Sequence, residues 1–190
     1  MSLPSSLRTD RLELLVSDPG AAVGVADYFR RNLEWLQKSS PTFPASITTV
    51  EHWEAKLAHQ QRLAKEGGEL RFFLKPHGEE RIVGTVSLTE IARGPLQQCL
   101  LGFGLDQVCT GRGLMREALE AVMRHAFQRL KLMKVRANYL PTNHTSARVL
   151  SRLGFVIEGR AERHVCIAGR WEDHILAALL NPQPELVETG

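Results

Sequence analysis

Apolar residues recur with two different periods along the chain, and the changes of period predict where the elements lie. Alternating apolar positions indicate strands, whereas apolar positions three or four residues apart indicate helices. The expected strands cover residues 10–16, 70–75, 81–91, 97–106, 134–139, 162–167 and 171–180. The expected helices cover residues 21–31, 113–132, about 143–153, and a stretch from Val50 to the Gly67-Gly68 pair.

The segments between the expected strands are short and rich in glycine and proline. Pro76-His77-Gly78, Arg93-Gly94-Pro95 and Ala168-Gly169 each separate two consecutive strands, which is typical of antiparallel hairpins. The amphipathic helices before and after these strands need a sheet against which to bury their apolar stripes. The sequence therefore predicts an α/β (α+β) fold, with a mixed, mostly antiparallel sheet and helices on both of its faces.

Length and composition favour one domain, spanning residues 1–180, followed by a tail at 181–190. The chain has 190 residues, of which 43% are hydrophobic, and this is enough to fill a core without disulfides. The tail carries two prolines and few apolar residues, so we expect it to fray. A homodimer is compatible with the sequence.

The cysteines, the N-terminus and the charge balance bear on compartment and partners. Three cysteines are an odd number, and they lack a CxxC spacing, which favours a reducing compartment. No export signal opens the chain and no run of about 18 apolar residues follows, so we expect a cytoplasmic protein that binds no membrane. With 24 Lys and Arg against 21 Asp and Glu, and no basic block, direct nucleic-acid binding is not expected.

A glycine pair stands where a strand gives way to the strongest helix pattern. Gly111-Arg112-Gly113 precedes a helix N-terminus, where N–H groups lack partners and the dipole is positive, so the turn suits a pyrophosphate. No Gly-Lys-Ser/Thr follows, and Arg116 occupies the third glycine of the dinucleotide pattern, which disfavours a nucleoside triphosphate or NAD. The simpler alternative is that the glycines only relieve a tight turn. A second strand-to-helix opening at Tyr139 to Ser146 favours a shared ligand site.

Six short motifs follow one another over nearly the whole chain. They are Thr9-Asp-Arg-Leu12, Gly102-Phe-Gly-Leu105, Thr110-Gly-Arg-Gly-Leu-Met115, Ala137-Asn-Tyr-Leu-Pro-Thr-Asn143, Arg152-Leu-Gly-Phe-Val156 and Ile167-Ala-Gly-Arg-Trp-Glu-Asp-His174. Their order and spacing resemble the GCN5-related N-acetyltransferase (GNAT) superfamily, and more narrowly the ribosomal-protein alanine N-acetyltransferases. The resemblance implies acetyl-CoA as co-substrate, no metal, and two central strands that splay apart.

The resemblance also implies which residues hold acetyl-CoA. The residues expected at the pyrophosphate are Thr110, Gly111, Arg112, Gly113, Leu114 and Met115. The pantetheine arm would lie between strands 97–106 and 134–139, along Phe103, Leu105 and Asn138. It would also meet the amide of Asn143, which on its own is a plain helix cap. Relatives usually have Gln or Arg in place of Thr110 and Gly or Ala in place of Met115, but backbone amide contacts depend little on those side chains.

No residue stands out as the proton donor to the leaving thiolate. Leu150 lies where many members of the superfamily carry a tyrosine that protonates the sulfur. Ser146 or Tyr139 would have to substitute. Because a serine hydroxyl is a poor proton donor near neutral pH, we expect Ser146 to donate a hydrogen bond to the developing thiolate.

The expected acceptor is the α-amine of a protein N-terminus, and the resemblance makes a ribosomal protein the specific expectation. An α-amine with a pKa of about 7.7 to 8.0 loses its proton easily near neutral pH, whereas a lysine amine at about 10.4 needs an assigned base. The stretch Leu101-Gly102-Phe103-Gly104, where relatives sometimes carry a catalytic carboxylate, has no titratable residue. Glu90 is the candidate base, and Asp173 and His174 are the alternatives, although such groups are more often structural.

Two other functions stay open at this point. The acceptor could be a small-molecule amine, since nothing in composition or spacing identifies a peptide. The chain could also be a non-catalytic module that binds acyl-CoA or a peptide, because neither the acid nor the base is evident.

Two further clusters have both a functional and a structural interpretation. His164, Cys166 and His174 could face one another across the last hairpin, but a fourth ligand at a sensible spacing is missing, so no metal is expected. Trp35 and Trp53 either pack in the core or form a wall of the acceptor groove.

Overall fold

The computed structural model describes residues 6–184. Within this part of the chain the strands are β1 (Ser6–Arg8), β2 (Leu12–Val16), β3 (Leu70–Pro76), β4 (Gly84–Ala92), β5 (Gln98–Leu105), β6 (Lys134–Tyr139), β7 (Val156–Ile167) and β8 (Arg170–Leu180). The α-helices are α1 (Ala22–Gln37), α2 (Val50–Glu66), α3 (Leu114–Gln128) and α4 (His144–Arg152). Short 3-10 segments at Pro19–Ala21, Ala45–Thr48 and Gln107–Cys109 precede α1, α2 and α3.

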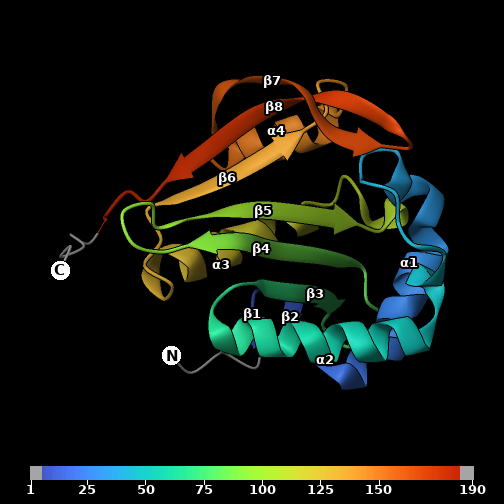
Figure 1. The fold of residues 1–190 in the computed structure, drawn as a ribbon. Helices are drawn as coiled ribbons and strands as arrows, with labels where there is room; N and C mark the ends of the chain where they lie inside the picture. Colours follow the sequence, from blue (N-terminus) through green and yellow to red (C-terminus); the bar gives the residue numbers. More distant parts are fainter. Residues whose placement is uncertain (1–5, 185–190) are drawn as a thin grey trace.

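The strands form a single sheet in the order β1-β2-β3-β4-β5-β6-β8-β7 (Figure 1). Neighbouring strands are antiparallel, except that β5 and β6 run parallel. A parallel pair needs a crossover, and α3 supplies it on the far side of the sheet in Figure 1. The predicted mixed, mostly antiparallel sheet is therefore confirmed.

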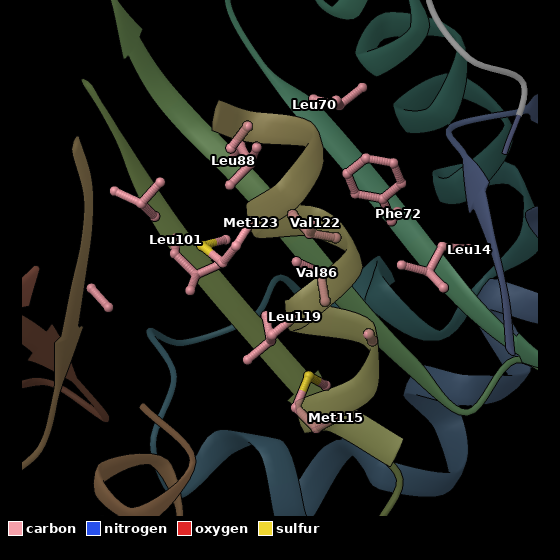
Figure 2. Close-up of a cluster of buried hydrophobic side chains, with 14 of the residues drawn as sticks. Leu14, Leu70, Phe72, Val86, Leu88, Leu101, Met115, Leu119, Val122 and Met123 are labelled. Carbon is pink, nitrogen blue, oxygen red and sulfur yellow. The ribbon is translucent and has the colours of Figure 1, made fainter. Parts of the chain in front are cut away.

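Apolar side chains fill both faces of the sheet. On one face, Leu119 and Val122 of α3 lie over Phe72 of β3 and its neighbours (Figure 2). On the other face, α1 and α2 enclose Phe73 together with Trp53. Phe72 and Phe73 are adjacent in β3 but belong to opposite clusters, because successive side chains of a strand point to opposite faces. The expectation of helices on both faces is confirmed.

Three elements begin or end elsewhere than the pattern predicts. The pattern does not predict β1, because three residues are too few to establish an alternation. α1 extends to Gln37 and not to residue 31, because Leu33 and Leu36 continue its apolar stripe against the sheet. β7 begins at Val156 and not at residue 162. The pattern misses this first part because the edge strand exposes both Val156 and Ile157 and so shows no apolar alternation there.

Two further elements, β4 and α3, are shorter than predicted. β4 begins at Gly84, although the N–H of Val83 already bonds to the carbonyl of Leu74 at 2.8 Å. α3 ends at Gln128 and not at residue 132, because Lys131 turns the chain with a φ of +56°.

The chain remains packed just beyond β8. The side chain of Asn181 donates to the carbonyl of Leu132 at 3.1 Å, and its N–H donates to that of Met133 at 2.9 Å. Asn181 therefore belongs to the folded part, whereas residues 185–190 of the predicted tail lie outside the described residues. Between residues 6 and 184, no helix is both long and apolar enough to span a membrane.

Candidate functional site

β5 and β6 pair only along the first four residues of each strand. Their ladder runs from the Gln98–Lys134 pair to the Leu101–Ala137 pair and stops there. β5 continues to Leu105 and stays paired with β4. In Figure 1 the two parallel strands diverge toward their carboxyl ends. The sheet therefore opens between β5 and β6, as the resemblance leads us to expect.

Backbone groups of β5 line this opening. Alternate residues of a strand direct their N–H and C=O groups to opposite neighbours. The carbonyl of Gly102 faces β4, where the Ser87 hydroxyl reaches it at 3.5 Å, so the backbone groups of Phe103 and Leu105 face the opening. The carbonyl of Leu105 accepts a hydrogen bond from the indole of Trp35 at 3.1 Å. Phe103 therefore offers its backbone at a position where an extended ligand arm can pair with β5.

Gly102 and Gly104 stand where neighbouring elements approach β5 closely. An added Cβ at Gly102 would lie 2.8 Å from the Ser87 hydroxyl oxygen. One at Gly104 would lie 3.1 Å from Leu36 Cδ2 and 3.2 Å from the Tyr28 hydroxyl oxygen. These separations are too short for a carbon atom to be added without a shift. Packing against β4 and α1 therefore favours glycine, and disfavours a titratable side chain, at positions 102 and 104.

The glycine turn links the opening to α3. Gly111 and Gly113 have φ angles of +77° and +78°, which residues with side chains rarely adopt, and the stretch between them is exposed. The N–H of Glu117 makes the first bond along α3, to the carbonyl of Gly113 at 3.1 Å. The three preceding N–H groups lie at the open, positive end of the helix. An exposed turn with these donors fits a pyrophosphate.

The side chains of the turn contribute less than its backbone. Thr110 donates its hydroxyl to the carbonyl of Gln107 at 2.8 Å. Met115 is buried against the sheet, in the core drawn in Figure 2. Leu114 is half-buried, whereas Arg112 is exposed. Roles for Thr110, Leu114 and Met115 at a ligand are therefore restricted mainly to their backbone atoms, while Arg112 also offers a cationic side chain.

An ion network around the buried Asp106, which the sequence analysis did not predict, lies just before the glycine turn in the chain. Asp106, directly after β5, is 2% exposed and accepts hydrogen bonds from the guanidinium groups of Arg31 and Arg81. It also accepts from the N–H of Val108 at 3.3 Å. Burial raises the pKa of Asp106, but the bonds from Arg81 and Arg31 outweigh it and hold the pKa below its usual value. The carboxylate is therefore ionised at neutral pH and ties α1 to the approach to the turn.

The second strand-to-helix opening follows β6. Asn143 Oδ1 accepts from the N–H of Ser146 at 3.0 Å, so Asn143 caps α4. The cap uses only the oxygen, which leaves the NH2 group able to donate to a ligand. Leu150 is buried in the core and offers no proton. Tyr139 is the last residue of β6, and Asn143 and Ser146 stand at the start of α4, which follows directly, so all three belong to the connection that leaves the carboxyl end of β6.

Asn138 connects the same end of β6 to the last hairpin. Its Nδ2 lies 3.0 Å from Nε2 of His164 on β7. The rings of His164 and His174 have centroids 5.7 Å apart, and His174 is buried with Nδ1 3.0 Å from the carbonyl of Glu172. No group of three or more His, Cys, Asp or Glu residues within 6–184 is arranged to hold a metal ion.

Glu90 lies before the opening and not inside it. It occupies a β-bulge of β4 with a φ of +50°, next to the part of β5 that carries Gln98 and Leu100. Its carboxylate binds the guanidinium of Arg136 at 3.0 Å. That pair would have to break before Glu90 could take a proton from an acceptor. The structure does not bring Glu90 together with Ser146, and its role as a base stays a prediction.

Asp173 holds the β7–β8 hairpin. Its carboxylate accepts from the N–H of Arg163 at 2.8 Å and from the Arg160 guanidinium at 2.6 Å. These donors, the Arg163 N–H first, lower the pKa of Asp173. A carboxylate held in this way is a weak base, so this geometry disfavours Asp173 as the proton acceptor.

The two tryptophans have different roles. Trp53 is buried, stacks on Phe29 with ring centroids 4.8 Å apart, and donates to the carbonyl of Ile47 at 2.7 Å. Trp35 is only partly buried and bonds to the end of β5. Trp53 is therefore a core residue, whereas Trp35 lies at the rim of the opening.

Comparison with known proteins decides the family. The family model for the acetyltransferase (GNAT) domain matches residues 17–156, well over half of the chain. The chain belongs to the GNAT family. In this GNAT protein the matched residues run from the end of β2 to the start of β7, and so include the opening, the glycine turn and α4.

Two relatives of this GNAT protein are named as N-acetyltransferases. The [ribosomal protein uS5]-alanine N-acetyltransferase of Escherichia coli (strain K12) is 35% identical over 176 residues, covering 93% of this chain and 91% of the relative. The probable N-acetyltransferase YjcK of Bacillus subtilis (strain 168) is 40% identical over 154 residues, covering 81% and 85%. This GNAT protein is therefore an N-acetyltransferase.

Solved structures agree with the GNAT fold. The ribosomal-protein-S5-alanine acetyltransferase from Vibrio fischeri matches with a TM-score of 0.92 at 33% identity, covering 95% of this chain and 99% of that one. Mycobacterium smegmatis RimJ, in complex with a CoA disulfide, has a TM-score of 0.86 at 24% identity and covers 94% and 88%. The second likeness concerns the fold alone.

Proposed function

We propose that this enzyme transfers the acetyl group of acetyl-CoA to the α-amine of a protein N-terminus, and that the acceptor is a ribosomal protein that opens on alanine. One observation carries the proposal: the glycine turn at the N-terminus of α3 and the opening between β5 and β6 lie at the same end of the sheet. A pyrophosphate and an extended arm can therefore be held together. The acceptor class rests on the relatives that modify the alanine of ribosomal protein uS5.

The pyrophosphate and the pantetheine arm of acetyl-CoA each have matching groups in the chain. The N–H groups of the turn 110–115 bind the pyrophosphate, with the Arg112 side chain nearby. The backbone of Phe103 and Leu105, with the side chain of Asn138, flanks the pantetheine arm. The NH2 group of Asn143 donates to the same arm. RimJ of Mycobacterium smegmatis, which shares the fold, binds a CoA disulfide, and this supports CoA as the ligand.

The transfer itself needs a neutral amine and a stabilised leaving group. The amine nitrogen bonds to the thioester carbon and loses a proton, the carbon–sulfur bond breaks, and the leaving thiolate takes up a proton, so that no net proton is consumed. An α-amine is deprotonated at pH 7 at a cost of about 1 kcal/mol, so a strong protein base is not required. This fits a site in which Asp173 is a weak base and Glu90 is paired with Arg136.

Replacing Ser146 with alanine is expected to lower kcat by about 10- to 100-fold while leaving the affinity for CoA unchanged. The reason is that Ser146 is assigned a hydrogen bond to the thiolate, and such charge-assisted bonds contribute about 1.5 to 3 kcal/mol. Steady-state kinetics of Ser146→Ala and Tyr139→Phe test this assignment. Full turnover of Ser146→Ala together with loss in Tyr139→Phe would transfer the role to the tyrosine.

The experiment for the proposed function is thiol release from acetyl-CoA with a panel of acceptors. The panel contains peptides that open on Ala or Ser, beside polyamines and aminoglycosides as small amines. We expect turnover on the peptides, with alanine preferred. Turnover on small amines alone would replace the protein acceptor by a small-molecule one. Tight CoA binding without any turnover would favour a non-catalytic acyl-CoA-binding module.

A further inference from the structure

The segment before β2 reaches across to the first turn of α3. The Glu117 carboxylate accepts three hydrogen bonds from it: from the Thr9 hydroxyl at 2.6 Å, from the N–H of Arg11 at 2.8 Å and from Arg11 Nε at 2.6 Å. Arg11 and Glu117 are 106 positions apart in the chain, so this is a long-range contact. Thr9 and Arg11 belong to the first of the sequence motifs, to which the proposed function gives no role.

Arg11 also bonds directly to the glycine turn. Its Nη1 donates to the carbonyl of Arg112 at 2.9 Å. In a trans peptide the C=O and the following N–H point in opposite directions. Because the Arg112 carbonyl points toward Arg11, the N–H of Gly113 points away from Arg11. With the left-handed φ at Gly111 and Gly113, this fixes the direction of the donors that a pyrophosphate needs.

The ion pair between Arg11 and Glu117 also affects the charge near the glycine turn. A carboxylate in the first turn of α3 stabilises the helix but would repel a pyrophosphate bound at its N-terminus. Burial raises the pKa of Glu117, but bonds from Thr9 and Arg11 lower it by more, so Glu117 is ionised at neutral pH. Arg11 compensates that charge and remains half exposed. Its Nη2 lies 3.5 Å from where a Cβ of Gly113 would stand, at the surface of the turn.

We propose that Arg11, oriented by Glu117 and Thr9, is the positioning residue of the CoA turn: it holds the Arg112–Gly113 peptide so that its N–H faces the pyrophosphate, and it offsets the charge of Glu117. The inference rests on the proposed function, because it takes the ligand of the turn to be CoA. If Arg11 only connected the segment between β1 and β2 to α3, its loss would lower the stability of the fold. It would then weaken the binding of ligands with and without a pyrophosphate equally.

Calorimetric titration of CoA into Arg11→Leu tests the proposal directly. We expect the Kd to rise roughly 10- to 100-fold, the range for one charge-assisted hydrogen bond. Arg11→Lys keeps the charge but cannot bridge Glu117 and Arg112 at once, so it should recover only part of the affinity. Two controls should bind CoA like the parent. Arg8→Leu makes the same change at an exposed residue of β1. Glu120→Gln removes a charge from the same helix, at a residue that forms a surface ion pair with Arg116.

A donor without the pyrophosphate separates positioning from general damage. With acetyl-pantetheine, kcat/KM of Arg11→Leu should stay within about 2-fold of the parent, whereas with acetyl-CoA the KM should rise and kcat change little. Equal losses with both donors, or an unchanged CoA affinity in a folded Arg11→Leu or Arg11→Lys variant, would overturn the inference. Because the titration needs no acceptor, a failure of the proposed acetyl transfer would appear only in turnover and would be told apart.

Discussion

Gly113→Asp is expected to weaken CoA binding about 100-fold and to leave the fold intact. Gly113 is exposed at the cap of α3 with a φ of +78°, and an aspartate there places a negative charge beside the pyrophosphate. Two charges about 4 Å apart near a protein surface repel by about 1 to 4 kcal/mol, which gives this magnitude. The new carboxylate would also compete for Arg11, whose Nη2 lies 3.5 Å from the position of the Cβ. Calorimetric titration of CoA measures the change.

The matched control for this substitution is Gly113→Asn. Asparagine has the same shape, carries no charge and tolerates a left-handed φ, so it should cost far less affinity than aspartate. Circular dichroism and thermal melting check that both variants fold. An aspartate variant that binds CoA as tightly as the parent would remove the pyrophosphate from this turn.

Asp106→Ala is expected to lower the free energy of unfolding by about 2 to 4 kcal/mol. The Asp106 side chain is 3% exposed, and its loss leaves the guanidinium groups of Arg31 and Arg81 without their buried partner. Both arginines keep some access to water, so the loss should lie below that of a fully buried pair. Urea denaturation measures it. Asp27→Ala is the control, because Asp27 contacts the same Arg31 at the surface and should cost no more than about 1 kcal/mol.

The same network predicts the acid side of the stability curve. The pKa of Asp106 is lower in the folded protein than its ordinary value of 3.8. The carboxylate therefore stabilises the fold fully above that ordinary value, and the contribution is lost as the pH falls through the lower, folded pKa. Asp106→Asn should consequently lose less, relative to the parent, at pH 3 than at pH 7. A difference that stays constant down to pH 3 would contradict an ionised Asp106 in the fold.

Local signals were enough to predict the helices and the turn. The spacing of apolar residues along α3 reflects direct packing on the sheet, which Figure 2 displays at Met115, Leu119 and Val122. Gly111 and Gly113 are needed for a backbone that few other residues adopt, so their identity carries the conformation of the turn. Asn143 caps α4 for reasons confined to four residues. Features of this kind can be read from sequence because cause and effect are neighbours in the chain.

Features that depend on distant partners could not be predicted in the same way. The Asp106 network joins Arg31, Arg81 and Asp106 from three separate parts of the chain. The residues next to each of them in the sequence do not distinguish it from the other charged residues, of which the chain has 45 in all. The bond between Arg11 and Glu117 is hidden for the same reason, although the motif around Arg11 hints at a role. The early start of β7 has no signal at all, because an edge strand with exposed side chains shows no apolar alternation.

The position at which acetyl is added to a peptide distinguishes an N-terminal acetyltransferase from the alternatives. The decisive measurement is mass spectrometry of two peptides after incubation with the enzyme and acetyl-CoA: both open on alanine and contain one internal lysine, but one has a blocked α-amine. We predict that the free peptide gains one acetyl group, located on its first residue by fragmentation, and that the blocked peptide gains none. Acetyl on the lysine of both peptides, or on neither peptide while a small amine is modified, would contradict the assignment as a protein N-terminal acetyltransferase.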